Sequence, residues 1–338
     1  MIKSMKRILA FSLALALCLS GCSVFPKRQY SVTYLDLFDT VTTITGTANS
    51  QEVFQEQAQS IYRQLKQYHQ LFDIYQEYPG FNNLKTVNDN AGIAPVAVDE
   101  EIVALLKDCR DYYELTQGRM NVAMGSVLRL WHESRRAALE DPKHGTLPEK
   151  AALQEALQHM DMNDLVLDAE NSTVYLADKA MSLDVGAVAK GWAAQQVAKT
   201  LPRGLLISIG GSVFATGPKD EKGTPWVVGV ENPDGGAYLH KLPLHDGGVA
   251  TSGDYQRFFV VDGVNYHHII DPDTGMPSVY WRSVSVVCRD SALADVLSTA
   301  LFVLPLEQGK DLAAKAQAEV MWLDHTGKQY YTDGCVFD

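Results

Sequence analysis

Cysteine is scarce in this sequence, which has 5 among 338 residues and no Cys-x-x-Cys pair. Two of them, Cys18 and Cys22, lie near the N-terminus, and the other three are widely separated. This pattern excludes a disulfide framework and a cysteine-rich zinc site. We expect Cys109, Cys288 and Cys335 to be buried free thiols, with a single disulfide as the alternative.

An excess of positive charge is also absent. The 29 lysines and arginines are outnumbered by 41 aspartates and glutamates, and the formal net charge is −12. A nucleic-acid-binding protein needs a basic surface to displace the counterions of phosphates, so we expect no nucleic-acid partner. An acidic protein that handles a phosphorylated ligand usually recruits a metal ion to do so.

Three common catalytic motifs are missing. No Gly-x-Gly-x-x-Gly follows a predicted strand, and no His-Glu-x-x-His is present. These absences argue against a dinucleotide-binding fold of the usual kind and against a zinc hydrolase. Ser212 follows paired glycines but lacks the glycine two residues later that a nucleophile elbow requires.

The N-terminus carries an apolar run over residues 8–19, which follows three basic residues and is too short to span a bilayer comfortably. The run ends in Leu19-Ser20-Gly21-Cys22, which resembles the lipobox of bacterial lipoproteins. The resemblance implies that residues 1–21 are a signal peptide and that Cys22 carries lipid. The mature protein would then be anchored to the membrane and face outside the cytoplasm. The alternative is an ordinary secretory signal.

Hydrophobic residues make up 46% of the chain, enough for a large core. We predict a tether over residues 22–30 and a folded domain over 31–338. Strands and helices interleave without regular βαβ spacing, which favours an α+β fold with mixed sheets and packed helices. The predicted strands are 35–45, 165–168, 173–176, 205–209, 226–231, 284–287, 319–323 and 328–332, with a hairpin over 256–270. The predicted helices are 51–75, 99–115, 148–159, 188–201 and 293–304. Residues 118–131 are predicted to form a loop that leads into a further helix.

The stretch 249–277 concentrates hydroxyls, acids and two histidines around this hairpin. Asp262-Gly263 is a strong signal for a type I′ turn. A hairpin brings its ends together, so we expect residues 252–254 and 267–271 to lie side by side. His267 and His268 are neighbours on a strand and should point to opposite faces. One of them is expected to face a site while the other packs or meets solvent.

Two further segments could contribute chemistry. Residues 182–191 place glycine, alanine and a lysine before a helix, an arrangement that suits a phosphate. A glycine-rich helix start with a surface lysine is the simpler alternative. Asp295 and Thr299 are four residues apart, so both oxygens project from one helix face. They could bind Mg²⁺, although the threonine could equally bond to its own helix.

Together these blocks resemble one family. The sequences DVGAVAKGWA, SIGGS, VATSGDYQRFF…HHIIDPDTG and ADVLSTALFVL are similar to the successive signatures of the ApbE family. Its members are flavin transferases with a T-fold-related architecture, which move FMN from FAD onto a protein hydroxyl. The resemblance covers nearly all of the chain from about Leu35 onward.

The resemblance implies roles for individual residues. The carbonyl of Ala187 would join Asp295 and Thr299 around Mg²⁺. His268 would lie at the reactive phosphate, and we predict it as the general base, with Asp254 or Asp271 as the second choice. The residues implied to contact FAD are Phe38, Tyr75, Val122, Ala123, Met124, Asp184, Lys190, Ser252, Gly253, Ile269 and Ile270.

The chain departs from the family pattern in three places. Ser212 replaces the usual acidic or amide residue after the paired glycines, which could weaken a polar contact with the nucleotide. The loop 120–126 lacks the usual hydroxyl at Ala123, so only backbone contacts would survive there. Phe38 replaces a common methionine and keeps an apolar surface.

The resemblance implies a Mg²⁺-dependent FAD:protein FMN transferase that releases AMP. FAD would be the substrate, and the acceptor would be a threonine or serine of a partner protein, such as an electron-transfer protein at the membrane. Two alternatives fit the same residues. If water replaces the hydroxyl, the protein is an FAD pyrophosphatase that yields FMN and AMP. A non-catalytic flavin-binding lipoprotein is the third possibility.

Overall fold

The computed structural model describes residues 27–334 and 337. The predicted signal peptide, the predicted lipidation site Cys22 and most of the predicted tether lie outside the described residues, as does Cys335. Cys109 is a buried free thiol, as expected, whereas Cys288 is a free thiol that is only partly buried. None of the helices formed by the described residues has the length and apolar character needed to cross a membrane.

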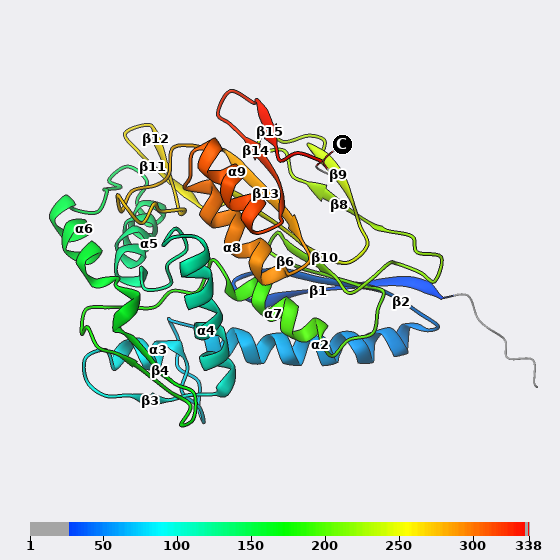
Figure 1. Ribbon diagram of the computed structural model, residues 1–338, viewed down its shortest axis with the longest axis horizontal. Helices are drawn as coiled ribbons and strands as arrows, with labels where there is room; N and C mark the ends of the chain where they lie inside the picture. Colours follow the sequence, from blue (N-terminus) through cyan, green and yellow to red (C-terminus); the bar gives the residue numbers. More distant parts are fainter. Residues whose placement is uncertain (1–26, 335–336, 338) are drawn as a thin grey trace, which may run out of the picture.

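An eight-stranded sheet forms the centre of the fold (Figure 1). Its strands pair antiparallel throughout, in the order β1-β2-β6-β7-β10-β13-β14-β15. The sheet joins strands from both ends of the chain: Thr42 of β2 pairs with Ile209 of β6. Its strands are β1 (Arg28–Leu37), β2 (Thr40–Ala48), β6 (Leu205–Ile209), β7 (Ser212–Ala215), β10 (Gly247–Gly253), β13 (Ser283–Cys288), β14 (Glu319–Leu323) and β15 (Gln329–Tyr331).

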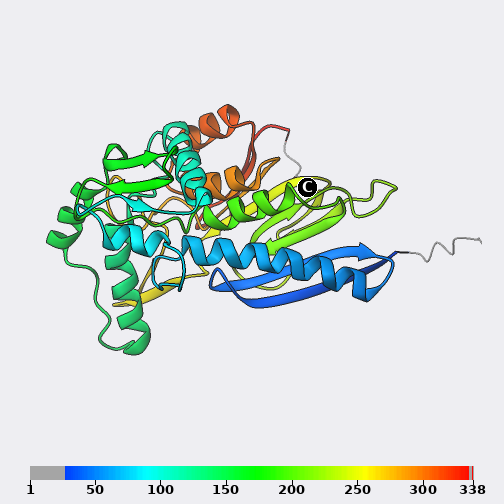
Figure 2. The same ribbon diagram turned by 90° about the horizontal axis from the view of Figure 1, so that it is seen from below.

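Three helices pack on one face of this sheet: α2 (Gln51–Phe72), α7 (Ala189–Ala198) and α8 (Ser291–Phe302). Helix α2 lies along β1 and β2, and α7 lies between α2 and α8 (Figure 2). Ser50 caps α2, and the buried side chains of α2 recur every three or four residues from Phe54 to Phe72. These helices and the sheet enclose the main hydrophobic core, which includes the buried side chains of Ile44, Phe54, Trp192 and Val286.

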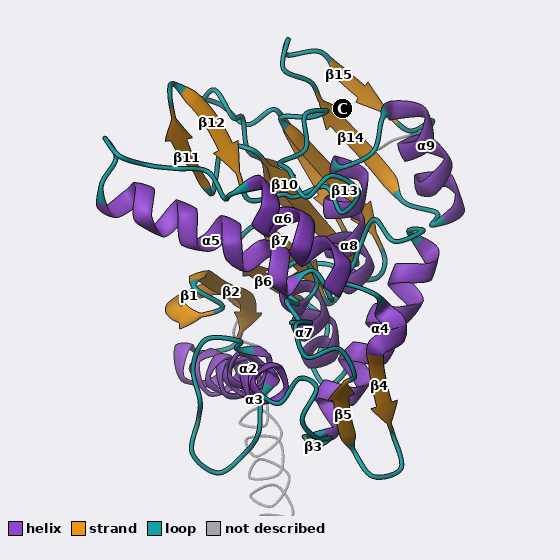
Figure 3. Ribbon diagram, turned by 90° about the vertical axis from the view of Figure 1, so that its left-hand side faces the viewer, coloured by secondary structure: helices purple, strands orange, loops and turns teal. Residues whose placement is uncertain are grey.

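Smaller units surround the central layers (Figure 3). Strands β8 (Trp226–Val230) and β9 (His240–Leu244) form a second core with β7, β10 and β14. Helices α5 (Gly125–Glu140) and α6 (Lys150–Ala156) pack on the hairpin of β11 (Phe258–Val261) and β12 (Val264–His267). The remaining elements are α3 (Leu84–Asp89), β3 (Val96–Ala97), α4 (Glu100–Leu115), η1 (Leu157–His159), η2 (Met162–Asp164), β4 (Leu165–Asp168), β5 (Thr173–Leu176) and α9 (Leu306–Lys315).

The α+β class is confirmed, and so is the type I′ hairpin turn, because Asp262 and Gly263 both have positive φ. The single strand predicted over 35–45 is wrong. Phe38 and Asp39 adopt φ of 52° and 50° and turn the chain, so this region forms two strands. The tether was also predicted too long, because β1 already begins at Arg28.

Candidate active site

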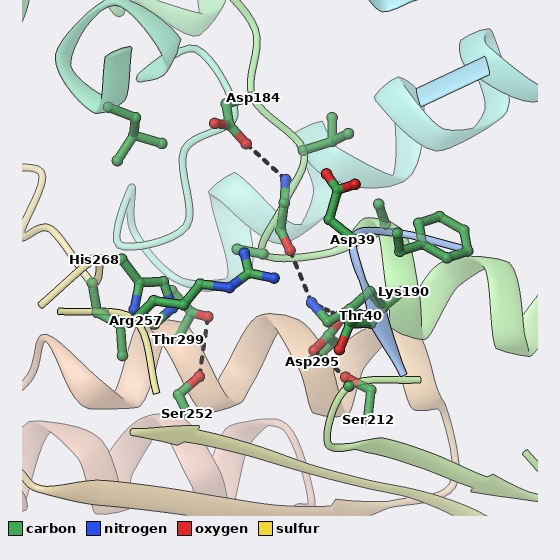
Figure 4. Close-up of a pocket in the computed structure, with 18 of the residues that line it drawn as sticks. Asp39, Thr40, Asp184, Lys190, Ser212, Ser252, Arg257, His268, Asp295 and Thr299 are labelled. Carbon is green, nitrogen blue, oxygen red and sulfur yellow. Dashed lines mark hydrogen bonds and ion pairs between the residues drawn. The ribbon is translucent and has the colours of Figure 1, made fainter. Parts of the chain in front are cut away.

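A cavity of about 650 Å³ opens where the β1–β2 turn, the start of α7, the end of β10 and α8 meet (Figure 4). This volume is within the range of pockets that hold small ligands and cofactors. Most of the predicted site residues line it, although they come from distant parts of the sequence. The lining includes Phe38, Tyr75, Met124, Asp184, Ala187, Lys190, Ser252, Gly253, His268, Ile269, Ile270, Asp295 and Thr299.

Asp295 is the most buried acid of the cavity lining. Only 5% of the residue is exposed, and its two oxygens have separate partners. Ser212 Oγ donates to Oδ1 at 2.7 Å, and the Gly191 backbone N–H donates to Oδ2 at 2.9 Å. The Lys190 ammonium lies 3.6 Å from Oδ2 (Figure 4). The carboxylate is therefore held in a fixed orientation by one hydroxyl, one amide and one cation.

The close approach of α7 and α8 depends on Gly191. A Cβ atom at this position would lie 2.3 Å from the carbonyl oxygen of Ser291 and 2.7 Å from Cβ of Asp295. No side chain fits between backbone and side-chain atoms at such distances. Ser291 reinforces the contact, because its Oγ donates to the Gly191 carbonyl at 2.7 Å. The absence of a side chain thus brings Lys190 and Asp295 together.

The oxygen donors near Asp295 suit a hard cation. Thr299 follows one helical turn later, and its Oγ1 lies 3.4 Å from Ser252 Oγ. Ala187 lines the same cavity. Among the described residues, no group of three or more histidines, cysteines or acids is arranged to hold a metal. One carboxylate with neutral oxygens fits an ion such as Mg²⁺, which takes few protein ligands and completes its shell with water and phosphate.

Residues 184–190 form a turn that enters α7. Asp184 Oδ1 accepts a hydrogen bond from the Gly186 N–H at 2.8 Å, and Lys190 Nζ donates to the Gly186 carbonyl at 3.0 Å. The turn is fixed from the other side, because the Asp184 N–H donates to the Val122 carbonyl at 2.8 Å. A helix start with a cation beside it favours an anionic group.

The two histidines have different environments, as expected from their alternation. His267 is buried, and its Nε2 lies 2.8 Å from the Ser278 carbonyl while its Nδ1 accepts from the Ile269 N–H at 3.2 Å. This pairing fixes a neutral tautomer with the proton on Nε2. The ring also packs edge-on against Phe302. His267 therefore has a structural position, and His268 lines the cavity.

His268 is held in its neutral form. Its Nδ1 is buried without a hydrogen-bond partner in the described part of the chain. Burial, followed by the positive charge of Arg257, lowers the pKa of His268 to about 3 from 6.5. Burial disfavours the charged imidazolium, and a neighbouring cation does the same. Its imidazole is therefore unprotonated at neutral pH, and the same lowered pKa makes it a weak base in the free protein.

This depressed pKa predicts a specific pH dependence of stability. Between about pH 6.5 and pH 3 the unfolded chain binds a proton at this histidine that the folded protein does not. The free energy of unfolding should therefore fall as the solution is acidified through this window. We expect His268→Asn to lose less of this free energy than the wild type between pH 7 and pH 5, measured by urea denaturation. Equal losses in both proteins would contradict the assignment.

The two alternative bases do not line the cavity. Burial raises the pKa of Asp254, in spite of the nearby Arg282 and His267, so its electrostatics would suit a base. Its carboxylate, however, lies 3.8 Å from His325, away from the cavity lining. Asp271 accepts a hydrogen bond from the Asp273 N–H at 2.9 Å and organises its own turn. The expectation that residues 252–254 and 267–271 lie near each other is confirmed, because members of both segments line one cavity and Asp254 lies near His267.

Val122 and Ala123 also lie outside the cavity lining, and both side chains are buried in the core. Their backbone groups have internal partners. The Val122 carbonyl accepts from Asp184, and the Ala123 N–H donates to Asn121 Oδ1 at 2.8 Å. Of the predicted loop, Met124 faces the cavity, together with Asn121, which the sequence did not single out.

Two aromatic residues of the cavity lining are held by contacts with histidines. The Tyr75 hydroxyl lies 2.8 Å from His132 Nδ1, a contact that joins the loop after α2 to α5. The Phe38 N–H donates to His69 Nδ1 at 3.1 Å, and the two rings pack edge to face. These contacts fix the positions of both residues in the cavity wall.

The sequence profile of the ApbE family matches residues 38–322. The chain belongs to the ApbE family. The match spans every wall of the cavity, from the β1–β2 turn to α8.

Known ApbE proteins are similar over much of their length. The chain is 39% identical over 245 residues to the FAD:protein FMN transferase of Treponema pallidum, an alignment that covers 67% of this chain and 66% of that protein. It is 28% identical to the enzyme of the same name from Haemophilus influenzae, covering 97% and 96% of the two chains. The crystal structure of the ApbE protein of Thermotoga maritima superposes with a TM-score of 0.77 at 30% identity, covering 90% and 97%.

One departure from the ApbE pattern has a second consequence. Ser212 is buried, and its hydroxyl donates to Asp295, so it helps to orient the carboxylate proposed to bind a metal. The weaker contact with the nucleotide stays a prediction. The polar cavity residues that sequence reasoning missed lie on several kinds of element: Asp39 and Arg257 in turns, Thr40 at the start of β2, His132 on α5 and Glu231 just after β8.

Proposed function

We infer that this ApbE-family chain transfers FMN from FAD to a threonine or serine hydroxyl of an acceptor protein and releases AMP. The observation that carries the proposal is one cavity that joins the Asp295–Thr299 oxygens, the turn before α7 and His268. These supply a cation site, an anion site and a base, the three components that phosphoryl-type transfer requires. The names of the relatives from Treponema pallidum and Haemophilus influenzae agree with this activity.

Asp295, Thr299 and the carbonyl of Ala187 would hold Mg²⁺. When bound, Mg²⁺ would supply Lewis-acid stabilisation of the negative charge on the pyrophosphate. Ser212 and Gly191 keep the Asp295 carboxylate in place for this role. Lys190 and the amides of the 184–190 turn would bind phosphate oxygens, and Phe38, Tyr75, Ile269 and Ile270 would contact the rings of FAD.

His268 would act as the general base. A neutral imidazole can take the proton of the acceptor hydroxyl as its oxygen attacks the FMN phosphorus. The cations at Arg257 and Lys190 disfavour the resulting imidazolium, but the negative phosphates of bound FAD would offset them. The hydroxyl oxygen forms the new bond to phosphorus, and the bond to the AMP oxygen breaks.

The location of the reaction follows from the N-terminus, if it is a lipoprotein signal. Lipid on Cys22 would hold the enzyme at the outer side of the cytoplasmic membrane. An acceptor would then be an exported or membrane-associated protein, such as an electron-transfer subunit. A mass spectrum of the mature N-terminus, with lipid on Cys22 expected, tests this part of the proposal.

The activity is tested by incubating the protein with FAD, Mg²⁺ and an acceptor domain that a related ApbE enzyme flavinylates. We expect the acceptor to gain the mass of FMN and visible flavin absorbance, with one AMP released per acceptor. An acceptor whose target threonine is replaced by alanine is the control. Release of free FMN without labelling would indicate an FAD pyrophosphatase, and unchanged FAD would indicate a binding protein.

A further inference from the structure

The ion pair of Lys190 and Asp295 joins two groups that the proposed function assigns to different ligands. Lys190 Nζ lies 3.6 Å from Asp295 Oδ2, with 21% and 8% of the two side chains exposed. Within residues 27–334, Lys190 is the only lysine, arginine or histidine at ion-pair distance from Asp295. The ammonium is therefore the protein's own counter-charge for this buried carboxylate.

A divalent cation bound to Asp295 would lie close to the Lys190 ammonium, and the two positive charges would destabilise each other's binding to the carboxylate. Both would bind the same carboxylate, and its oxygens already accept from Ser212 and Gly191. Two like charges a few ångströms apart repel strongly where water is largely excluded. A cation that binds Asp295 must therefore weaken the contact of Lys190 with that carboxylate.

Lys190 has an alternative position inside the cavity. It lies in the first turn of α7, its long stem is flexible, and its Nζ also donates to the Gly186 carbonyl at 3.0 Å. It lines the same cavity as Asp184, Arg257 and His268. A phosphate at the start of α7 would give the displaced ammonium a new anionic partner without a change in the backbone.

We propose that Lys190 exchanges between Asp295 and the phosphates of FAD, so that the divalent cation and FAD promote each other's binding. This inference rests on the proposed function and deepens it. In the free enzyme Lys190 opposes cation binding at Asp295. With FAD bound, Lys190 pairs with phosphate, and the carboxylate is available to the cation. Such coupling is reciprocal by thermodynamic necessity.

Titration with Mn²⁺, followed by its electron paramagnetic resonance signal, tests the exchange. Mn²⁺ is a spectroscopic substitute for Mg²⁺ at oxygen sites. We expect Lys190→Met to bind Mn²⁺ about fivefold or more tightly than the wild type without FAD. We also expect FAD to increase Mn²⁺ affinity less in this variant than in the wild type. If Lys190 only supported the site structurally, its loss would weaken Mn²⁺ binding instead.

Lys199→Met is the matched control, because it removes the same charge from an exposed position at the other end of α7. It should bind Mn²⁺ as the wild type does. Unchanged or weaker binding by Lys190→Met, with circular dichroism showing a folded protein, would overturn the exchange. If Asp295→Asn bound Mn²⁺ as tightly as the wild type, the metal assignment of the proposed function would fail instead. The two failures are therefore distinguishable.

Discussion

Asp295→Ala is expected to reduce FMN transfer by at least about a thousandfold, because it removes the only acidic ligand proposed for the cation. The carboxylate is buried, accepts hydrogen bonds from Ser212 and Gly191, and forms an ion pair with Lys190. Its loss also leaves the Lys190 ammonium without its counter-charge. Rates of acceptor labelling at saturating FAD and Mg²⁺ measure the effect.

The control for this variant is Asp311→Ala, which removes an exposed acid from α9. Its labelling rate should equal that of the wild type. Thermal unfolding of both variants shows whether a reduced labelling rate reflects the missing carboxylate or an unfolded protein. Full Mg²⁺-dependent turnover by folded Asp295→Ala would show that the cation is held elsewhere.

Substitutions of the two adjacent histidines should have different effects, one on the rate of FMN transfer and the other on the free energy of unfolding. We expect His268→Asn to slow FMN transfer by about a hundredfold to ten-thousandfold, since a positioned base contributes on that order. FAD binding should change little, because the proposed role of His268 lies in the proton transfer. Single-turnover labelling and FAD fluorescence titration measure the two quantities.

His267→Ala should show the opposite behaviour. It leaves the Ser278 carbonyl and the Ile269 N–H without their buried partner and removes the ring that packs on Phe302. The loss of such buried hydrogen bonds costs about 1–3 kcal/mol of unfolding free energy. Urea denaturation measures this loss. If His268→Asn lost the stability and His267→Ala lost the proton transfer, the two roles would have to be reversed.

Much of the fold was predictable because local patterns agree with the tertiary structure. The apolar period from Phe54 to Phe72 predicted α2, and the helix predicted over 99–115 agrees with α4, which Asp99 caps. The Asp262-Gly263 turn was equally clear. Strands β7, β9 and β10 were not predicted. Strand β10 is rich in glycine and small residues, β9 contains Pro243, and β7 has only four residues, so their sequences give a weak strand signal. Pairing with neighbouring strands stabilises them in the fold.

The candidate site was also predictable only where a local sequence pattern places the residues. Asp295 and Thr299 were found because helical spacing alone places them on one face. Asp39 and Arg257 were missed because they lie in turns that line the cavity. The backbone conformation of a turn, such as the positive φ at Asp39, places the side chain but leaves no periodic pattern in the sequence. The partner of Ser212 could not be inferred, since it lies on another element 83 positions away in the sequence.

The pairing of β2 with β6 has a consequence for how the protein matures. The cavity takes its walls from residues between Phe38 and Thr299, and the sheet that aligns them joins strands that are distant in the chain. Folding rates fall when native contacts are so non-local. A chain that ends before α8 lacks a cavity wall, so FAD can bind only after nearly the whole chain has folded. Because such a ligand stabilises the folded state alone, FAD supply would also protect the enzyme from proteolysis.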